Sequence, residues 1–153
     1  MARAIIIYES NYGNTRLVAE KIVEGLKEIP GIEPALQELK EVDRTRLAGY
    51  DAILIGSPNH IGRATGGISK FITGLGKLNL TGKAAAVFDT YLGRDFEKAV
   101  KKMEKQLTGK APGLKLIAPG LSVRVDGMKG PISDGELPRC QEFGVTIANL
   151  IKN

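Results

Sequence analysis

Five short apolar segments alternate with segments of helical hydrophobic periodicity, and this alternation constrains the fold more than any other feature of the 153-residue chain. Parallel strands need long crossover connections, and such crossovers are right-handed. The pattern therefore predicts an α/β three-layer sandwich, with a five-stranded parallel sheet and helices on both faces. No linker or repeat interrupts the pattern, so we expect residues 1–153 to form a single domain. The predicted strands are Ala4 to Tyr8, Pro34 to Leu39, Ala52 to Gly56, Ala84 to Phe88 and Leu114 to Val125.

Helical periodicity places four helices between and after these strands. The last strand contains Pro119-Gly120, which predicts an edge strand with a bend or break. Asp134 is a candidate cap of the last helix, and Cys140 on its apolar face is predicted to pack in the core. The apolar faces comprise Val18, Ile22 and Leu26; Ile68, Phe71, Ile72 and Leu75; Phe96, Val100, Met103 and Leu107; and Leu137, Cys140, Gly144, Ile147 and Ile151.

Composition narrows the function classes. The chain is 42% hydrophobic and 25% charged, values typical of a soluble globular protein, and no apolar run approaches a membrane span. We therefore expect a cytoplasmic protein with no membrane partner. Cys140 is the only cysteine and His60 the only histidine, so no disulfide and no His/Cys metal cluster is expected.

The formal net charge of +5 raises the question of a nucleic-acid partner. Lysines alternate with acids along segments such as Glu97 to Lys105, a pattern typical of a solvated helix face. No aromatic stacking motif accompanies the basic residues, so we expect no nucleic acid partner. Attraction to an acidic protein fits the charge better.

The segment Ser10-Asn11-Tyr12-Gly13-Asn14-Thr15 joins the first strand to the first helix. A tight turn at a helix N-terminus aims backbone N–H groups at one point, where partial positive charge favours a phosphate. Gly13 supplies backbone freedom, while Ser10, Asn14 and Thr15 offer donors; Asn14 or Thr15 is also a candidate helix cap. An ordinary capped turn is the alternative interpretation.

Other phosphate-binding loops fit less well. Gly82-Lys83 is followed by Ala84, which excludes a nucleoside triphosphate loop of the usual pattern. Gly74-Leu75-Gly76 lacks a third glycine and a preceding strand, so a dinucleotide fingerprint is not supported.

Two further loops follow predicted strands at the same edge of the sheet, where ligands of such folds bind. Ser57 to Gly62 contains residues that present backbone groups, with Asn59 and Gly62 able to adopt positive φ. His60 can stack on a planar ring or lie in solvent. Asp89 to Gly93 places Tyr91 where it can stack on an aromatic ligand or pack on the next helix. Together the loops suit a ligand with a phosphate tail and a planar head.

The chain resembles the flavodoxin-like family. Its first loop is similar to the phosphate loop [ST]-x-x-G-x-T, and Tyr50 to Pro58 resembles the third strand and second loop of that family. The likeness is greatest to the FMN module of flavo-diiron (A-type) flavoproteins. The residues that resemble the tail of that module are Pro119-Gly120-Leu121, Pro131, Leu137, Cys140 and Gly144. The di-iron domain has no counterpart in this chain, and Leu92-Gly93 stands where Gly-Trp is common.

The resemblance implies FMN as the cofactor. It implies that Ser10, Asn11, Tyr12, Gly13, Asn14 and Thr15 surround the phosphate. It also implies that Pro58, Asn59, His60, Ile61 and Gly62 lie along the isoalloxazine, with Thr90, Tyr91, Leu92 and Gly93 on its other side. Ser57 and Asp89, which begin the second and third loops, complete the predicted site, and Asp89 is a candidate acid near the ring.

Three functions compete at this point. The leading one is an FMN-binding electron carrier that exchanges electrons with a redox protein such as an acidic ferredoxin or its reductase. The alternative is an FMN-dependent NAD(P)H:quinone-type oxidoreductase, and the third is a binding domain with a degenerate site. A phosphorelay receiver is excluded, because the third strand ends in Ser57-Pro58 and not in an acceptor aspartate.

Overall fold

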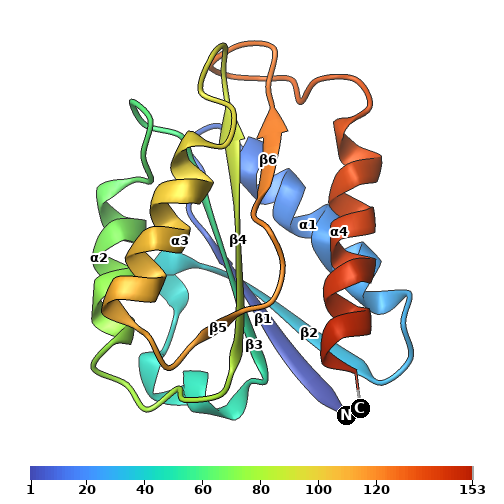
Figure 1. The fold of residues 1–153 in the computed structure, drawn as a ribbon. Coiled ribbons are helices and arrows are strands. Elements are labelled where there is room, and N and C mark those ends of the chain that lie inside the picture. The colour runs from blue at the N-terminus through green and yellow to red at the C-terminus, as the bar shows by residue number, and fades with distance from the viewer. Residues whose placement is uncertain (153) are drawn as a thin grey trace.

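The computed structural model describes residues 1–152, and its strands form one parallel sheet (Figure 1). The order across the sheet is β2-β1-β3-β4-β5, and β6 also pairs with β4. Every pairing between these strands is parallel, as the alternating pattern predicts. The strands are β1 (Ala2–Tyr8), β2 (Ile32–Glu38), β3 (Ala52–Pro58), β4 (Ala84–Tyr91), β5 (Lys115–Leu116) and β6 (Leu121–Arg124).

Helices cover both faces of the sheet, which makes the three predicted layers. One face is covered by α1 and α4 and the other by α2 and α3, each pair side by side (Figure 1). A separate hydrophobic cluster fills each interface: Ile6 and Leu54 point to the first, Ile5 and Ile53 to the second. This alternation along β1 and β3 is the expected consequence of the two-residue period of a strand. The helices are α1 (Asn14–Lys27), α2 (Gly66–Leu75), α3 (Lys98–Lys110) and α4 (Glu136–Ile151), with 3₁₀ turns at Leu39–Glu41 and Arg44–Gly49.

Two glycines let α1 and α4 approach closely. A Cβ on Gly144 would collide with the carbonyl oxygen of Ile22, and one on Gly25 would collide with that of Gln141. The two helix backbones are therefore in direct contact, and α4 packs against α1 and β6. Cys140 lies in the same interface, fully buried, as predicted. Burial raises the pKa of its thiol to about 12, so this cysteine is a packing residue.

The edge of the sheet is interrupted where the sequence predicts a break. Pro119 and Gly120 separate β5 from β6, and both short strands pair with β4. The Gly120 N–H donates to Glu104 Oε2 at 3.0 Å, so the interruption is tied to α3. β6 then continues toward the end of the sheet where β4 terminates.

Three local predictions are wrong. Phe96 is half-exposed and precedes α3, so it takes no part in that helix's apolar face. Asp134 does not cap α4, because the N-cap is Gly135 with a φ of 83°. Neither Asn14 nor Thr15 caps α1, whose N-cap is Gly13 with a φ of 90°. In both helices a glycine in the left-handed region turns the chain sharply into the first turn, so no side-chain cap forms.

Within residues 1–152, none of the helices has the length and apolar character needed to cross a membrane.

Candidate functional site

The loops that follow β1, β3 and β4 converge on a cavity of about 560 Å³ at the carboxyl edge of the sheet. These loops lie together at the top of Figure 1, with the connection after β6 beside them. The cavity is lined by Ser10, Asn11, Tyr12, Asn14, Thr15, Pro58, Asn59, His60, Ile61, Thr90, Tyr91, Leu92, Asp95, Val125 and Met128.

Backbone geometry in the first loop leaves the hydroxyl of Ser10 able to donate. Ser10 Oγ accepts hydrogen bonds from the N–H groups of Gly13 at 3.0 Å and Arg16 at 3.4 Å. Its own hydrogen is not used by either bond, so it remains free for a ligand in the cavity. Gly13 itself does not line the cavity, but its φ of 90° makes the turn that brings the start of α1 to this edge.

Thr15 connects the first loop to the third. Its side chain is buried, and its Oγ1 lies 2.9 Å from Oγ1 of Thr90 near the end of β4. Both threonines line the cavity, so the hydrogen bond fixes two of its walls to each other.

The second loop is a tight hairpin whose tip is strained. His60 and Arg63 pair across it through N–H···O bonds of 2.7 and 3.2 Å. Between them, Ile61 and Gly62 have φ values of 53° and 79°, and two consecutive positive φ values are the mark of a type I′ turn. Asn59 is not among the residues with positive φ, so the positive φ falls two residues further along, on Ile61, as well as on Gly62 as predicted.

Asn59 and His60 tie this hairpin to its neighbours. The Asn59 N–H donates to the Thr90 carbonyl at 2.8 Å, and Asn59 Oδ1 accepts from the Gly62 N–H at 2.9 Å. His60 is exposed, and its Nε2 lies 3.0 Å from Nδ2 of Asn11 in the first loop. The three loops are thus joined to one another by side-chain or backbone bonds.

Two aromatic residues stand at the cavity walls. Tyr91 packs edge-on against Phe96, with ring centroids 5.5 Å apart, and burial raises the pKa of its phenol. Tyr12 is half-exposed; its hydroxyl approaches Sδ of Met128 at 3.8 Å, and Lys129 Nζ lies 5.9 Å from its ring centre. Tyr12 in the first loop and Tyr91 in the third loop therefore each offer an aromatic surface to a planar ligand.

Asp89 supports the site from below and does not line the cavity. It is fully buried, with Oδ1 accepting from Ser122 Oγ at 2.6 Å and Oδ2 from the Val100 N–H at 3.0 Å. Ser122 Oγ in turn accepts from the N–H of Glu97, whose φ is 61°. Burial raises the pKa of Asp89 to about 6, although both hydrogen bonds act to lower it. This network holds the end of the third loop at the start of α3.

Three more predicted residues, besides Gly13 and Asp89, stay out of the cavity lining: Ser57, Gly62 and Gly93. Ser57 is buried beneath the second loop, where its Oγ donates to the Pro58 carbonyl and accepts from the Thr65 N–H.

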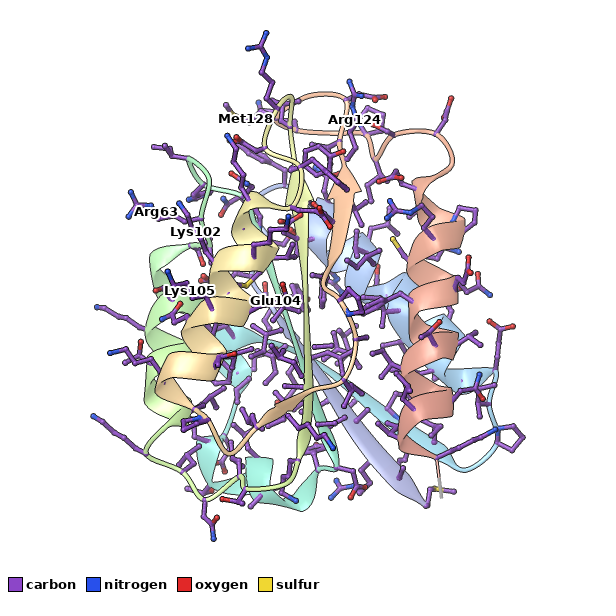
Figure 2. All side chains as sticks on the ribbon, in the orientation of Figure 1. Arg63, Lys102, Glu104, Lys105, Arg124 and Met128 are labelled. Carbon is purple, nitrogen blue, oxygen red and sulfur yellow. The ribbon has the colours of Figure 1, made fainter. Side chains whose placement is uncertain are left out.

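Three residues that line the cavity are not among the residues predicted from the sequence. Val125 directly follows β6, so the rule that ligands bind beyond the carboxyl ends of strands could have found it. Asp95 lies beyond the predicted end of the third loop. Met128 lies in the connection to α4, labelled in Figure 2 at the same end as Arg124. Asp126-Gly127 and Gly130-Pro131 mark this connection as a turn, but no pattern marks Met128 as a cavity residue.

The fold is a parallel α/β sandwich with a cavity at the carboxyl edge of its sheet. Hydroxyl and amide donors gather there at a turn that leads into a helix. These features define a class of small-molecule-binding protein. Residues 5–124 match the family model described as a flavodoxin domain, and the chain belongs to this flavodoxin-like family.

Comparison with solved structures agrees over nearly the whole chain. A flavodoxin from the domain Archaea is 26% identical and superposes with a TM-score of 0.84, covering 99% of both chains. Oxidised Flavodoxin 2 from Bacillus cereus is 28% identical with a TM-score of 0.81, covering 97% of this chain and 99% of that one. The flavodiiron protein from Giardia intestinalis shares the fold, with a TM-score of 0.79 over 96% of this chain and 35% of its own.

Two of the similar curated proteins have names that describe different functions. An NAD(P)H dehydrogenase (quinone) from Geobacter sulfurreducens is 32% identical over 114 residues, covering 55% of each chain. A flavodoxin from Aquifex aeolicus is 29% identical over 93 residues, covering 59% of this chain and 50% of that protein. The chain spans about half the length of these two relatives.

FMN is the cofactor of the flavodoxin family, and the residues of this chain fit it. The donors around the first loop are neutral hydroxyl and amide groups at a helix N-terminus, a set that suits a phosphate monoester. The aromatic faces of Tyr12 and Tyr91 and the backbone of the 58–62 hairpin suit a flat ring system.

Proposed function

We propose that this protein is an FMN-binding electron carrier. The observation that carries the proposal is the meeting of three loops around one cavity, with phosphate donors in the first loop and aromatic or backbone groups in the other two. When bound, FMN supplies transfer of one or two electrons, chemistry that protein side chains do not provide.

The roles proposed for this chain's residues follow from their positions. Ser10, Asn11, Asn14 and Thr15 donate hydrogen bonds to the phosphate, assisted by the N-terminal amides of α1. Residues 58–61 and 90–92 flank the ring. Gly13, Ser57, Gly62, Asp89 and Gly93 support these loops from outside the cavity lining.

The ionisable groups of the lining favour a carrier over an enzyme with its own acid or base. His60 is exposed and contacts Asn11, and Asp95 forms an ion pair with Lys98 at 3.0 Å. Neither residue is buried, so neither is held in the fixed position that a proton donor to a substrate needs.

The partner that we propose is an acidic redox protein, such as a ferredoxin or its reductase. Flavodoxins exchange electrons with protein partners, and the formal net charge of +5 favours an acidic one.

Titration of the apoprotein with FMN and with riboflavin tests the proposal. We expect FMN to bind much more tightly, because without the phosphate the donors of the first loop stay unused. Equal affinity for the two, or no flavin binding at all, would overturn it.

A second candidate is an FMN-dependent NAD(P)H:quinone-type oxidoreductase, favoured by the likeness to the Geobacter protein. Steady-state turnover of NAD(P)H with a quinone by the FMN-loaded protein alone, abolished by His60→Ala, would establish this function in place of the carrier.

A further inference from the structure

Three of the cations that have no carboxylate within ion-pair distance in residues 1–152 lie along the hairpin after β3 and along α3. They are Arg63 on the second hairpin and Lys102 and Lys105 on α3, here called the basic strip. Figure 2 shows the three side chains one below another along the same side of the molecule. All three residues are exposed.

The hairpin and α3 are in contact, so the strip is one surface. A Cβ built on Gly62 would stand 3.6 Å from Cδ of Lys98 and 3.8 Å from Nζ of Lys102. Gly62 adjoins Arg63 and follows Ile61, which lines the cavity. The positive charge of α3 therefore reaches the cavity wall through this hairpin.

Nearby acids do not neutralise the strip. Glu97 pairs with Lys101 at 3.6 Å, and Asp95 pairs with Lys98. Glu104, the one acid within α3, points away from the basic strip. Its Oε2 accepts a hydrogen bond from the Gly120 N–H, and Figure 2 labels it on the side of α3 that faces the connection between β5 and β6. The helix thus presents its acid inward and leaves Lys102 and Lys105 outward.

Ile61 adds an apolar contact at the tip of the hairpin. Its side chain is 92% exposed, and its φ of 53° is unfavourable for a β-branched residue. An isoleucine in that position gains neither burial nor a relaxed backbone from folding. Strained residues of this kind cluster at functional sites.

Other large exposed apolar side chains gather at the same end of the sheet. They are Tyr12, Leu92 and Met128, which line the cavity, and Phe96, which packs on Tyr91. An apolar centre with a charged margin is the usual anatomy of a protein–protein interface.

We propose that the basic strip and Ile61 form the docking surface for an acidic redox protein, which approaches the cavity mouth from the α3 side. This deepens the proposed function and rests on it. Charge complementarity steers the acidic partner to Arg63, Lys102 and Lys105, and Ile61 is then covered beside the cofactor site. A nucleic acid would satisfy the cations but would leave the isoleucine exposed to water.

A matched pair of triple variants tests the proposal. R63Q/K102Q/K105Q removes the strip, whereas K77Q/K110Q/K115Q removes the same charge from exposed positions at the opposite end of the sheet. The probe is an acidic [2Fe–2S] ferredoxin, and its dissociation constant is measured by calorimetry with the FMN-loaded protein at low ionic strength.

We expect the strip variant to lose about tenfold in ferredoxin affinity and most of the salt dependence, and the control variant to behave like wild type. Equal losses in the two variants, or no ferredoxin binding by the wild type, would overturn the proposal. Tighter strip-dependent binding of a single-stranded DNA oligomer would assign the surface to nucleic acid instead. FMN titration separates the two hypotheses. Failure of wild type to bind FMN refutes the carrier and, with it, the docking surface. The strip variant should bind FMN like wild type, because none of its three residues lines the cavity, so a loss of ferredoxin affinity in that variant reports on docking.

Discussion

The buried hydroxyl of Thr15, in the first turn of α1, lies 2.9 Å from the hydroxyl of Thr90, near the end of β4. The two residues are 75 positions apart in the sequence, and both line the cavity. The bond joins the loop predicted to hold the phosphate to the loop predicted to flank the ring. The Thr15 hydroxyl therefore makes a hydrogen bond in the apoprotein and also belongs to the proposed cofactor site.

Replacing Thr15 should weaken FMN binding and destabilise the apoprotein. Thr15→Ala deletes a donor to a charged phosphate, a loss of roughly 1.5 to 3 kcal/mol, or about tenfold to a hundredfold in the dissociation constant. It also leaves the Thr90 hydroxyl buried without its partner, which costs roughly 1–3 kcal/mol of unfolding free energy. Flavin fluorescence titration and urea unfolding measure the two effects. Thr15→Ser keeps the hydroxyl and serves as control; an unchanged FMN affinity in Thr15→Ala would place the phosphate elsewhere.

Gly13→Val should weaken FMN binding because of backbone conformation and not because of a clash in the apoprotein. A Cβ at Gly13 meets no atom within 4 Å, yet the φ of 90° is unfavourable for any side chain and most of all for a β-branched one. The turn would have to relax, which moves the N-terminal amides of α1. Gly13→Asn is the matched control, because asparagine tolerates the left-handed region. The idea fails if valine and asparagine variants bind FMN equally well.

The sequence predicts the site best where local rules act alone. Ser10 to Thr15 could be recognised because a strand, a glycine turn and a helix follow one another directly, and the carboxyl-edge rule then brings the loops after β3 and β4 to the same place. The break at Pro119-Gly120 likewise follows from the conformational limits of two residues.

The remaining features depend on contacts that the sequence does not reveal. Asp89 is a candidate acid near the ring on sequence grounds, and the sequence does not reveal that its carboxylate is buried and accepts a hydrogen bond from Ser122, a partner 33 residues away on β6. Ile61 takes the positive φ expected at Asn59, a conformation that β-branched residues rarely adopt. Met128 reaches the cavity only because the connection between β6 and α4 folds over it.

Ile61→Asn should stabilise the apoprotein. Asparagine tolerates the left-handed region, so the substitution relieves strain of about 1 kcal/mol, while the 92% exposed side chain contributes little burial to be lost. Thermal and urea unfolding of the apoprotein measure the gain. Ile61→Val retains the β-branched side chain and should show no gain. A destabilised Ile61→Asn variant would mean that the isoleucine supports the hairpin in a way that its exposure does not reveal.

The stability of the protein should decline between about pH 4 and pH 6 on account of Asp89. Burial raises the pKa of its carboxyl from 3.8 to about 6, so in this interval the folded state holds a proton that the unfolded state has released. Stability falls with rising pH wherever the folded state binds more protons, and the shift corresponds to a loss of about 3 kcal/mol that is complete above pH 6.

Asp89→Asn carries no charge at this position and should lack that decline. Urea unfolding of the apoprotein across this pH range, with the free energy of unfolding compared at each pH, measures the difference between the variant and wild type. Glu33→Gln, at an exposed position on β2, provides the control and should follow wild type. If Asp89→Asn and wild type lose stability in parallel from pH 4 to pH 6, the buried carboxyl is already ionised at the lower pH, and the hydrogen bonds from Ser122 and Val100 outweigh its desolvation.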